Sequence, residues 1–145
     1  MQSRNFRLQR VGDLNWLESN YKFQEISFSL DELIVLNVKR GPKDIGGFAS
    51  VVKELVEDVF IPVAAGGGIR SLGDADKLFK NGADKIILNS ALYETPDLVS
   101  EIAGKYGSQS VIASVDYRHV EGTTRAFIND GTQLIDMHLH EYLMK

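Results

Sequence analysis

Three consecutive glycines stand between a short apolar run and a helix start in the stretch Ile61–Arg70. An apolar run bounded by glycine is typical of a strand buried on both faces. Gly67 and Gly68 allow a sharp turn and expose backbone N–H groups without side-chain obstruction. Ser71 is a favourable N-cap, with Asp74 three residues later as in a capping box. A strand, a glycine loop and a helix N-terminus together predict a phosphate cradle. The alternative is a tight turn that binds no ligand.

The segments around this loop alternate between short apolar runs and helical patterns. The apolar runs cover residues 33–38, 61–66, 85–89 and 111–115. Between them, apolar residues recur at helical spacing, with Pro96 at one helix start and Gly82 and Gly107 at two helix ends. Strands that alternate with helices of this length predict parallel strands joined by right-handed crossovers. We therefore predict an α/β fold of about four parallel βα units.

The predicted strands are too few to close a barrel. A complete TIM-type (β/α)₈ barrel usually needs about 250 residues, whereas this chain has 145 and is expected to form one domain over residues 1–145. We expect a partial barrel with two unpaired sheet edges, which favour pairing with another chain. The chain is then either a piece of a larger barrel or a homo-oligomer that completes its core between copies. Residues 4–10 show no clear buried strand, and residues 140–145 resemble the middle of a helix.

Turn signals near the C-terminus predict a β-hairpin beyond the fourth strand. Val120–Thr123 and Asn129–Gly131 flank the short run 125–128. His119 is expected to be a solvated loop residue. His138 and His140 stand two apart, a spacing that suits one face of a strand but not of a helix. Because their surroundings look helical, we expect no metal site there.

The composition excludes several classes of function. The net charge is −4 and the isoelectric point about 5.3, so no broad basic surface indicates nucleic-acid binding. There is no cysteine, which excludes disulfides and thiolate metal ligands. No apolar stretch reaches the length of a membrane span, and the N-terminus lacks the apolar core of a signal peptide. We therefore expect a cytoplasmic protein that needs no metal or cofactor and binds neither nucleic acid nor membrane.

Taken in order, these motifs resemble the cyclase subunit of imidazole glycerol phosphate synthase, the HisF-type barrel of histidine biosynthesis. The matching residues are Asp31–Leu33, Ile61–Pro62, Gly66–Arg70, Gly82–Lys85, Asn89–Ser90, Pro96, Gly107–Gln109 and Asp116. The resemblance covers roughly residues 13–127, and the ordered set is specific although a glycine triplet alone is not. Residues 8–21 and the strand end Leu36–Val38 look more like HisF-like paralogues of surface-polysaccharide pathways, in which ammonia from a glutaminase would serve amidino-sugar synthesis.

The resemblance implies a phosphate-binding role for residues of the glycine loop and of the next strand end. The family's barrel binds a bis-phosphorylated ribulosyl aminoimidazole, and one phosphate rests in the N-terminal half. The positions carried over are Gly68, Asn89 and Ser90, with Gly67 beside them in the loop. They lie at the carboxyl ends of predicted strands, where barrel active sites are built. The alternative for Asn89 and Ser90 is a plain helix N-cap.

The resemblance also implies an acid–base residue and an ammonia gate. Asp116 matches one of the family's two catalytic aspartates, which act as general acid and base. It ends an apolar run, where a carboxylate at a barrel mouth can have a shifted pKa; the alternative is a cap for the following turn. Glu32 and Lys85 match part of a charged ring that, in the family, gates ammonia arriving from a HisH-like glutaminase subunit. The alternative for this pair is an ordinary salt bridge.

Departures from the family limit what this chain is expected to do. The other catalytic aspartate lies on the family's first strand, which would precede this sequence, and the last three strands with the second phosphate site would follow it. Asn37 replaces a family aspartate. Because positioning the substrate at two sites supplies much of the catalytic advantage, we expect no complete cyclisation by this chain alone. Three interpretations stay open: a fragment or shortened form of a HisF-like ammonia-dependent synthase of lyase type, a self-associating phosphate-binding module, and a remnant without a ligand.

Overall fold

A four-stranded parallel sheet forms the centre of the molecule. The structure is a computed structural model that describes residues 2–4, 7–9, 13–22, 25 and 27–144. The strands are β3 (Leu33–Leu36), β4 (Val63–Gly66), β5 (Lys85–Leu88) and β6 (Val111–Ala113), in the spatial order β3–β4–β5–β6. All three pairings are parallel, with Leu33 opposite Val63 and Ile87 opposite Ile112. The predicted parallel βα arrangement is thereby confirmed.

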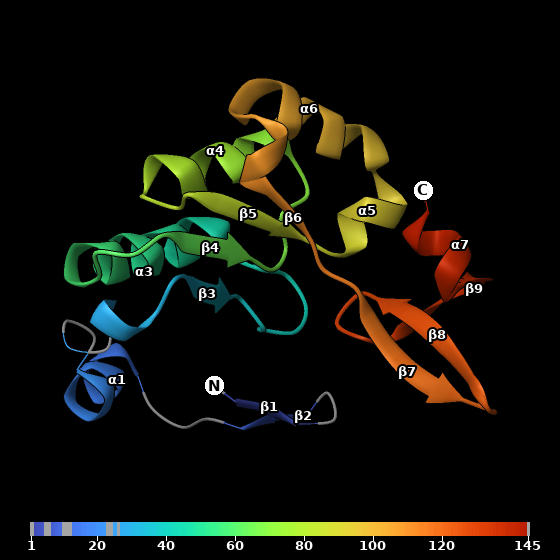
Figure 1. Cartoon of the computed structure of the whole chain (residues 1–145), viewed down its shortest axis with the longest axis horizontal. Coiled ribbons are helices and arrows are strands. Elements are labelled where there is room, and N and C mark those ends of the chain that lie inside the picture. The colour runs from blue at the N-terminus through green and yellow to red at the C-terminus, as the bar shows by residue number, and fades with distance from the viewer. Residues whose placement is uncertain (1, 5–6, 10–12, 23–24, 26, 145) are drawn as a thin grey trace.

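Helices cover one face of this sheet (Figure 1). α3 (Ile45–Asp58) joins β3 to β4, and α4 (Leu72–Lys80) joins β4 to β5. α5 (Ser90–Glu94), α6 (Pro96–Tyr106) and the 3₁₀ helix η2 (Ser108–Ser110) join β5 to β6. The core between helices and sheet contains Val52, Leu78, Ile86 and Ile102, whose side chains are fully buried. Removing this apolar surface from water is the main force that holds the layers together.

The residues at the helix ends explain where the helices begin and end. The Ser71 side chain accepts a hydrogen bond from the backbone N–H of Asp74 at the start of α4. Gly82 and Gly107 follow α4 and α6 with φ of +96° and +90°, a conformation that glycine adopts at low cost. The predicted helix start at Pro96 is also confirmed. The short α5 was not predicted, because five residues are too few to show a helical period.

The opposite face of the sheet is open along β3. Ile34 and Leu36 alternate with the partly buried Leu33 and Val35, and Ile34 and Leu36 are 59% and 48% exposed. Within the described residues the sheet does not close into a barrel, since β3 and β6 are its two edges. This open sheet agrees with the predicted partial barrel.

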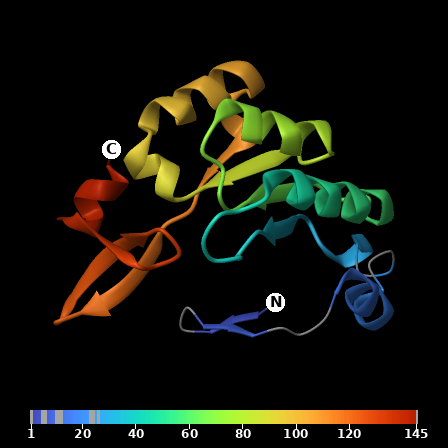
Figure 2. The same ribbon diagram turned by 180° about the vertical axis from the view of Figure 1, so that it is seen from behind.

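The N-terminal segment forms a short hairpin, a helix and a 3₁₀ helix. β1 (Gln2–Arg4) and β2 (Arg7–Gln9) pair as an antiparallel hairpin, and α1 (Leu14–Tyr21) and the 3₁₀ helix η1 (Ser27–Ser29) follow. Figures 1 and 2 both place the β1–β2 hairpin beyond β3, on the side away from α4 and α6. The strands β1 and β2 were not predicted from the sequence. Three-residue strands are too short to show the alternation that identifies a strand.

A three-stranded antiparallel sheet follows β6. It consists of β7 (Asp116–Val120), β8 (Thr123–Ile128) and β9 (Gln133–His138), and α7 (Leu139–Leu143) packs on it. The hairpin predicted from the turn signals is confirmed as β7–β8, but the structure adds β9. The assignment of His119 to a loop was wrong in consequence, because His119 lies in β7. His138 ends β9, and the expected helical surroundings hold for His140, which lies in α7.

Candidate functional site

The glycine loop turns sharply at the carboxyl end of β4. Gly67 and Gly68 have φ of +98° and +90°, values that favour glycine. The loop leads to the N-cap Ser71, as predicted, but Asp74 differs from a capping box in detail. Its carboxylate accepts the backbone N–H of Arg70 at 3.2 Å, one residue before the N-cap. The loop and the start of α4 are therefore fixed by their own hydrogen bonds.

Asn89 and Ser90 lie at the carboxyl end of the neighbouring strand β5. Asn89 is the N-cap of α5, yet its side chain makes no capping hydrogen bond. Its Nδ2 donates instead to the Ser114 carbonyl oxygen at 3.0 Å. The Ser90 hydroxyl accepts the backbone N–H of Asn129 at 2.9 Å and lies 3.4 Å from the Asn89 Oδ1. Both side chains thus face the loops at this edge of the sheet rather than capping a helix.

Asp116 begins an antiparallel strand instead of ending a parallel one. β6 ends at Ala113, and Asp116 is the first residue of β7, where it pairs with Phe127. The expectation that Asp116 ends the strand formed by the apolar run was therefore wrong, because that strand ends at Ala113 and pairing with β8 starts at Asp116. Burial raises the pKa of the half-buried Asp116 carboxyl above its ordinary value, and the negative charge of Asp130 raises it further, whereas Lys43 opposes the shift.

Lys43 and Asp130 also lie at the carboxyl end of the parallel strands. They were not identified from the sequence as site residues. The Lys43 Nζ lies 2.8 Å from the Asp130 Oδ1 and donates to the Asn37 carbonyl oxygen at 3.1 Å. The Lys43 stem passes over the Gly68 backbone, since a β-carbon on Gly68 would lie 2.5 Å from the Lys43 Cδ. The sequence held one signal, the turn at 129–131, but nothing in it connected that turn to Lys43.

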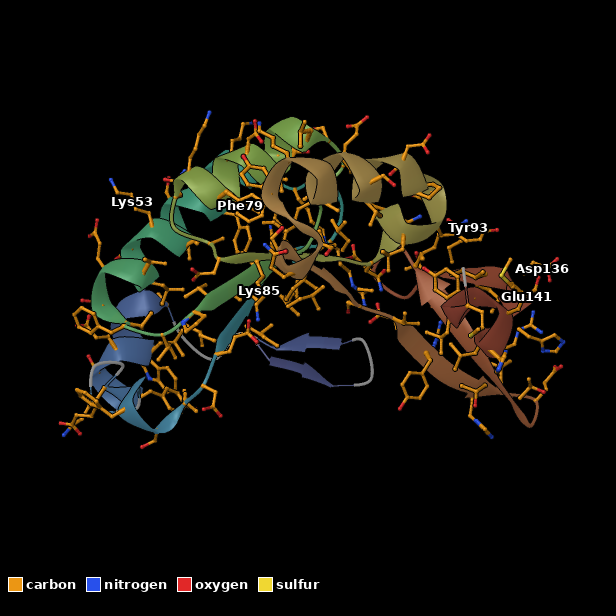
Figure 3. The ribbon with its side chains drawn as sticks, turned by 45° about the horizontal axis from the view of Figure 1, so that its top comes forward. Lys53, Phe79, Lys85, Tyr93, Asp136 and Glu141 are labelled. Carbon is orange, nitrogen blue, oxygen red and sulfur yellow. The ribbon has the colours of Figure 1, made fainter. Side chains whose placement is uncertain are left out.

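Glu32 and Lys85 form an ion pair at the opposite end of the sheet. The Lys85 Nζ lies 2.8 Å from the Glu32 Oε1, and both side chains are partly exposed. Figure 3 shows Lys85 reaching below the parallel sheet, on the side opposite to Phe79 of α4. The structure therefore brings the two residues of the predicted gate together, in an arrangement that an ordinary salt bridge shares.

The described residues contain no metal centre of the usual kind. In this part of the chain, no three histidine, aspartate or glutamate side chains lie together as possible ligands. The His119 Nδ1 lies 3.0 Å from the Thr124 hydroxyl on an exposed strand. None of the helices formed by the described residues has the length and apolar character needed to cross a membrane.

Comparison with known proteins relates nearly the whole chain to one family. Residues 11–145 match the family model described as histidine biosynthesis protein. The chain is 44% identical over 141 residues to a Parasynechococcus marenigrum protein named imidazole glycerol phosphate synthase subunit hisF2, covering 97% of this chain and 52% of that protein. The HisF subunit of the same synthase is 35% identical over 108 residues in Dictyoglomus thermophilum, covering 74% of this chain and 41% of the relative. The HisF subunit of Phocaeicola vulgatus is 33% identical over 135 residues, covering 93% and 52%. The chain spans about half the length of the curated relatives it matches.

Proposed function

The chain belongs to the histidine biosynthesis protein family, and we propose that it carries one phosphate site and one acid–base residue of a HisF-type cyclase. The observation that supports this proposal best is the gathering of Gly68, Asn89, Ser90 and Asp116 at the carboxyl edge of the parallel sheet. That edge is where barrel enzymes build their sites. The ligand would be a sugar phosphate of the kind that imidazole glycerol phosphate synthase uses.

The phosphate would lie between the glycine loop and the end of β5. Gly67 and Gly68 bring backbone amides to the surface of the loop without side chains of their own. Asn89 and Ser90 add a side-chain amide and a hydroxyl, and the Asn89 side chain makes no helix-capping hydrogen bond. Amide and hydroxyl donors of this kind form charge-assisted hydrogen bonds to phosphate oxygens. The four residues would therefore hold the phosphate and leave the rest of the substrate to extend toward Asp116.

Asp116 would move protons as a general acid and base. A carboxyl whose pKa is raised by burial and by Asp130 keeps its proton to a higher pH than an exposed aspartate does. A group of this kind can donate and accept a proton within one reaction cycle. The resemblance assigns only one of the two catalytic aspartates to this chain, so we propose that Asp116 alone does not complete the cyclisation.

Glu32 and Lys85 would belong to a passage for ammonia at the other end of the sheet. Their partly exposed ion pair lies at the amino ends of β3 and β5, away from Gly68 and Asp116. A HisH-like glutaminase would bind near that end and supply the ammonia. The pathway would be histidine biosynthesis or the related amidino-sugar synthesis in the cytoplasm.

A second candidate function is a non-catalytic phosphate-binding module that associates with its own copies. The exposed apolar side chains of Ile34 and Leu36 on the open sheet face favour it. In this case the phosphate site would be kept and the acid–base chemistry of Asp116 would not be used. Both candidates require the phosphate site, and only the first uses Asp116 as an acid and base.

Calorimetric titration with inorganic phosphate and with ribose 5-phosphate tests the site that both candidates share. Ser90→Asp places a negative charge at the proposed phosphate position, so we expect affinity to fall at least about tenfold by charge repulsion. Ser90→Thr keeps the hydroxyl and is the matched control, which should retain most of the affinity. Equal affinities of the wild type and Ser90→Asp would contradict the site. Turnover by the wild type with ammonia would exclude the binding module, and it would also contradict our expectation that this chain alone does not complete the cyclisation.

A further inference from the structure

We propose that Lys43 is a further anion-binding residue of this site, and that its ammonium pairs with the Asp130 carboxylate until a bound phosphate replaces that carboxylate. The inference rests on the proposed phosphate site and adds a residue that neither the glycine loop nor the β5 end contains. It makes Asp130 a competitor of the ligand. The loop after β3 and the turn between β8 and β9 would then decide together how tightly the site binds anions.

Lys43 is held against the glycine loop. Its stem lies against Gly68, with the Cδ 2.5 Å and the Cβ 2.9 Å from the place of a β-carbon. Its side chain is 13% exposed. Two of its three ammonium hydrogens serve the Asn37 carbonyl oxygen at 3.1 Å and the Asp130 carboxylate at 2.8 Å. A cation held beside the proposed phosphate loop is therefore already bonded to an anion.

Asp130 belongs to the tight turn between β8 and β9. Asp130 and Gly131 have φ of +58° and +72°, and Thr132 donates its N–H to the Asn129 carbonyl oxygen at 3.2 Å, as in a type I′ turn. Asn129 donates its backbone N–H to the Ser90 hydroxyl at 2.9 Å. The same turn thus reaches Ser90 on one side and Lys43 on the other, which are the two flanks of the proposed site.

The anchoring of this turn does not depend on Asp130. The Asn129 Nδ2 donates to Glu94 at 2.8 Å and to Gln133 at 2.9 Å. The turn stays fixed at its first residue when the Lys43–Asp130 pair opens. Asparagine also adopts left-handed φ readily, so Asp130→Asn should preserve the turn while removing the charge.

Charge explains why the exchange would be needed. The charge of Asp130 disfavours ionisation of Asp116, and the Lys43 ammonium favours it. The Arg118 guanidinium also reaches this turn, where it donates to the Gly131 carbonyl oxygen at 2.6 Å. A phosphate that enters between two carboxylates is repelled unless a cation accompanies it. A lysine has a flexible four-carbon stem and three donors, so its ammonium can turn from Asp130 to a phosphate without moving the loop.

The experiment compares inorganic phosphate binding across a double-mutant cycle by calorimetry. Asp130→Asn frees the ammonium. We expect the Kd of this variant for phosphate to be at least about fivefold lower than that of the wild type. Lys43→Met keeps the stem on Gly68 but removes the charge, and should raise Kd at least about tenfold. In the Lys43→Met background, Asp130→Asn should bring no larger gain than Asp136→Asn. Asp136 is a fully exposed acid of the same sheet and is the matched control for net charge.

The outcomes separate this proposal from the phosphate site itself. A gain from Asp130→Asn that persists in Lys43→Met would overturn the exchange, because Asp130 would then act only as a repelling charge. Weaker binding by Asp130→Asn would overturn it as well. If folded wild type and Asp130→Asn both bind no phosphate, the phosphate site fails and this proposal fails with it. Circular dichroism checks folding, and Lys43→Gln repeats the cycle if Lys43→Met does not fold.

Discussion

Gly67 packs so closely on Asn37 that no side chain fits between them. A β-carbon on Gly67 would overlap the Asn37 carbonyl oxygen and lie 2.9 Å from its backbone nitrogen. On Gly68, by contrast, a β-carbon would meet the side chain of Lys43. Both glycines have left-handed φ. The first therefore makes room for backbone and the second for a side chain from a neighbouring loop.

This difference predicts unequal costs for two alanine substitutions. Gly67→Ala combines backbone strain with a collision that only movement of the Asn37 segment can relieve, so we expect it to lower the free energy of unfolding by about 3 kcal/mol. Gly68→Ala has similar strain, but the Lys43 loop can shift, so we expect about 1–2 kcal/mol. Urea unfolding measures both. A larger loss for Gly68→Ala would show that the Lys43 loop is more rigid than the sheet edge.

The raised pKa of Asp116 predicts a pH-dependent gain of stability in Asp116→Asn. An acid whose pKa is higher in the folded state than in the unfolded chain stabilises the fold fully below its ordinary pKa of 3.8. This contribution is lost as the pH rises through the raised value. Asp116→Asn does not ionise, so it should be more stable than the wild type at neutral pH, and the difference should vanish in acid.

Thermal unfolding at neutral and acidic pH measures this difference. Asp136→Asn removes the same charge from a fully exposed position of the same sheet and is the control. The pH-dependent gain should be confined to Asp116→Asn. A gain of equal size at both pH values would mean that the carboxyl affects packing rather than charge at this position.

The core predicts a large cost for removing one side chain of α4. Leu78 is fully buried between the helices and the sheet, and Leu78→Ala leaves a cavity that this packing can fill only in part. We expect a loss of about 3 kcal/mol in the free energy of unfolding. Leu143→Ala truncates the same residue type at a site that is 60% exposed and should cost far less. Urea unfolding at one protein concentration compares them, and equal losses would contradict the packing.

The parallel sheet could be predicted because each βα unit has its own local signals. The apolar run before Gly66, the N-cap Ser71 and the terminating Gly82 each act within a few residues, and the structure confirms all three. The elements that were missed are β1, β2, α5 and β9. The first three have too few residues to show a period. In β9, the apolar Leu134 stands at an exposed position next to the buried Ile135, which blurs the alternation of apolar and polar residues in the sequence.

The candidate site could be predicted only where topology alone brings residues together. Gly68 and Asn89 follow neighbouring parallel strands, so their proximity follows from the order of the sheet. Lys43 and Asp130 lie 87 positions apart, in two loops whose meeting depends on how the antiparallel sheet folds back on the parallel one. The sequence analysis recognised only part of that second sheet. For the same reason it placed Asp116 at the end of the parallel strand instead of at the start of β7.

The open face of the sheet predicts that copies of this chain associate. Ile34 is 59% exposed on β3, an edge strand with apolar neighbours, and burying such a side chain contributes about 1.5–3 kcal/mol. We expect light scattering to find a dimer or higher assembly at micromolar concentration. Ile34→Lys should weaken association at least about tenfold, because it removes the apolar contact and adds a charge that association would desolvate. Phe60→Lys changes another exposed apolar residue, outside β3, and should leave the mass unchanged. A folded wild-type monomer, or equal effects of both variants, would contradict association through this face.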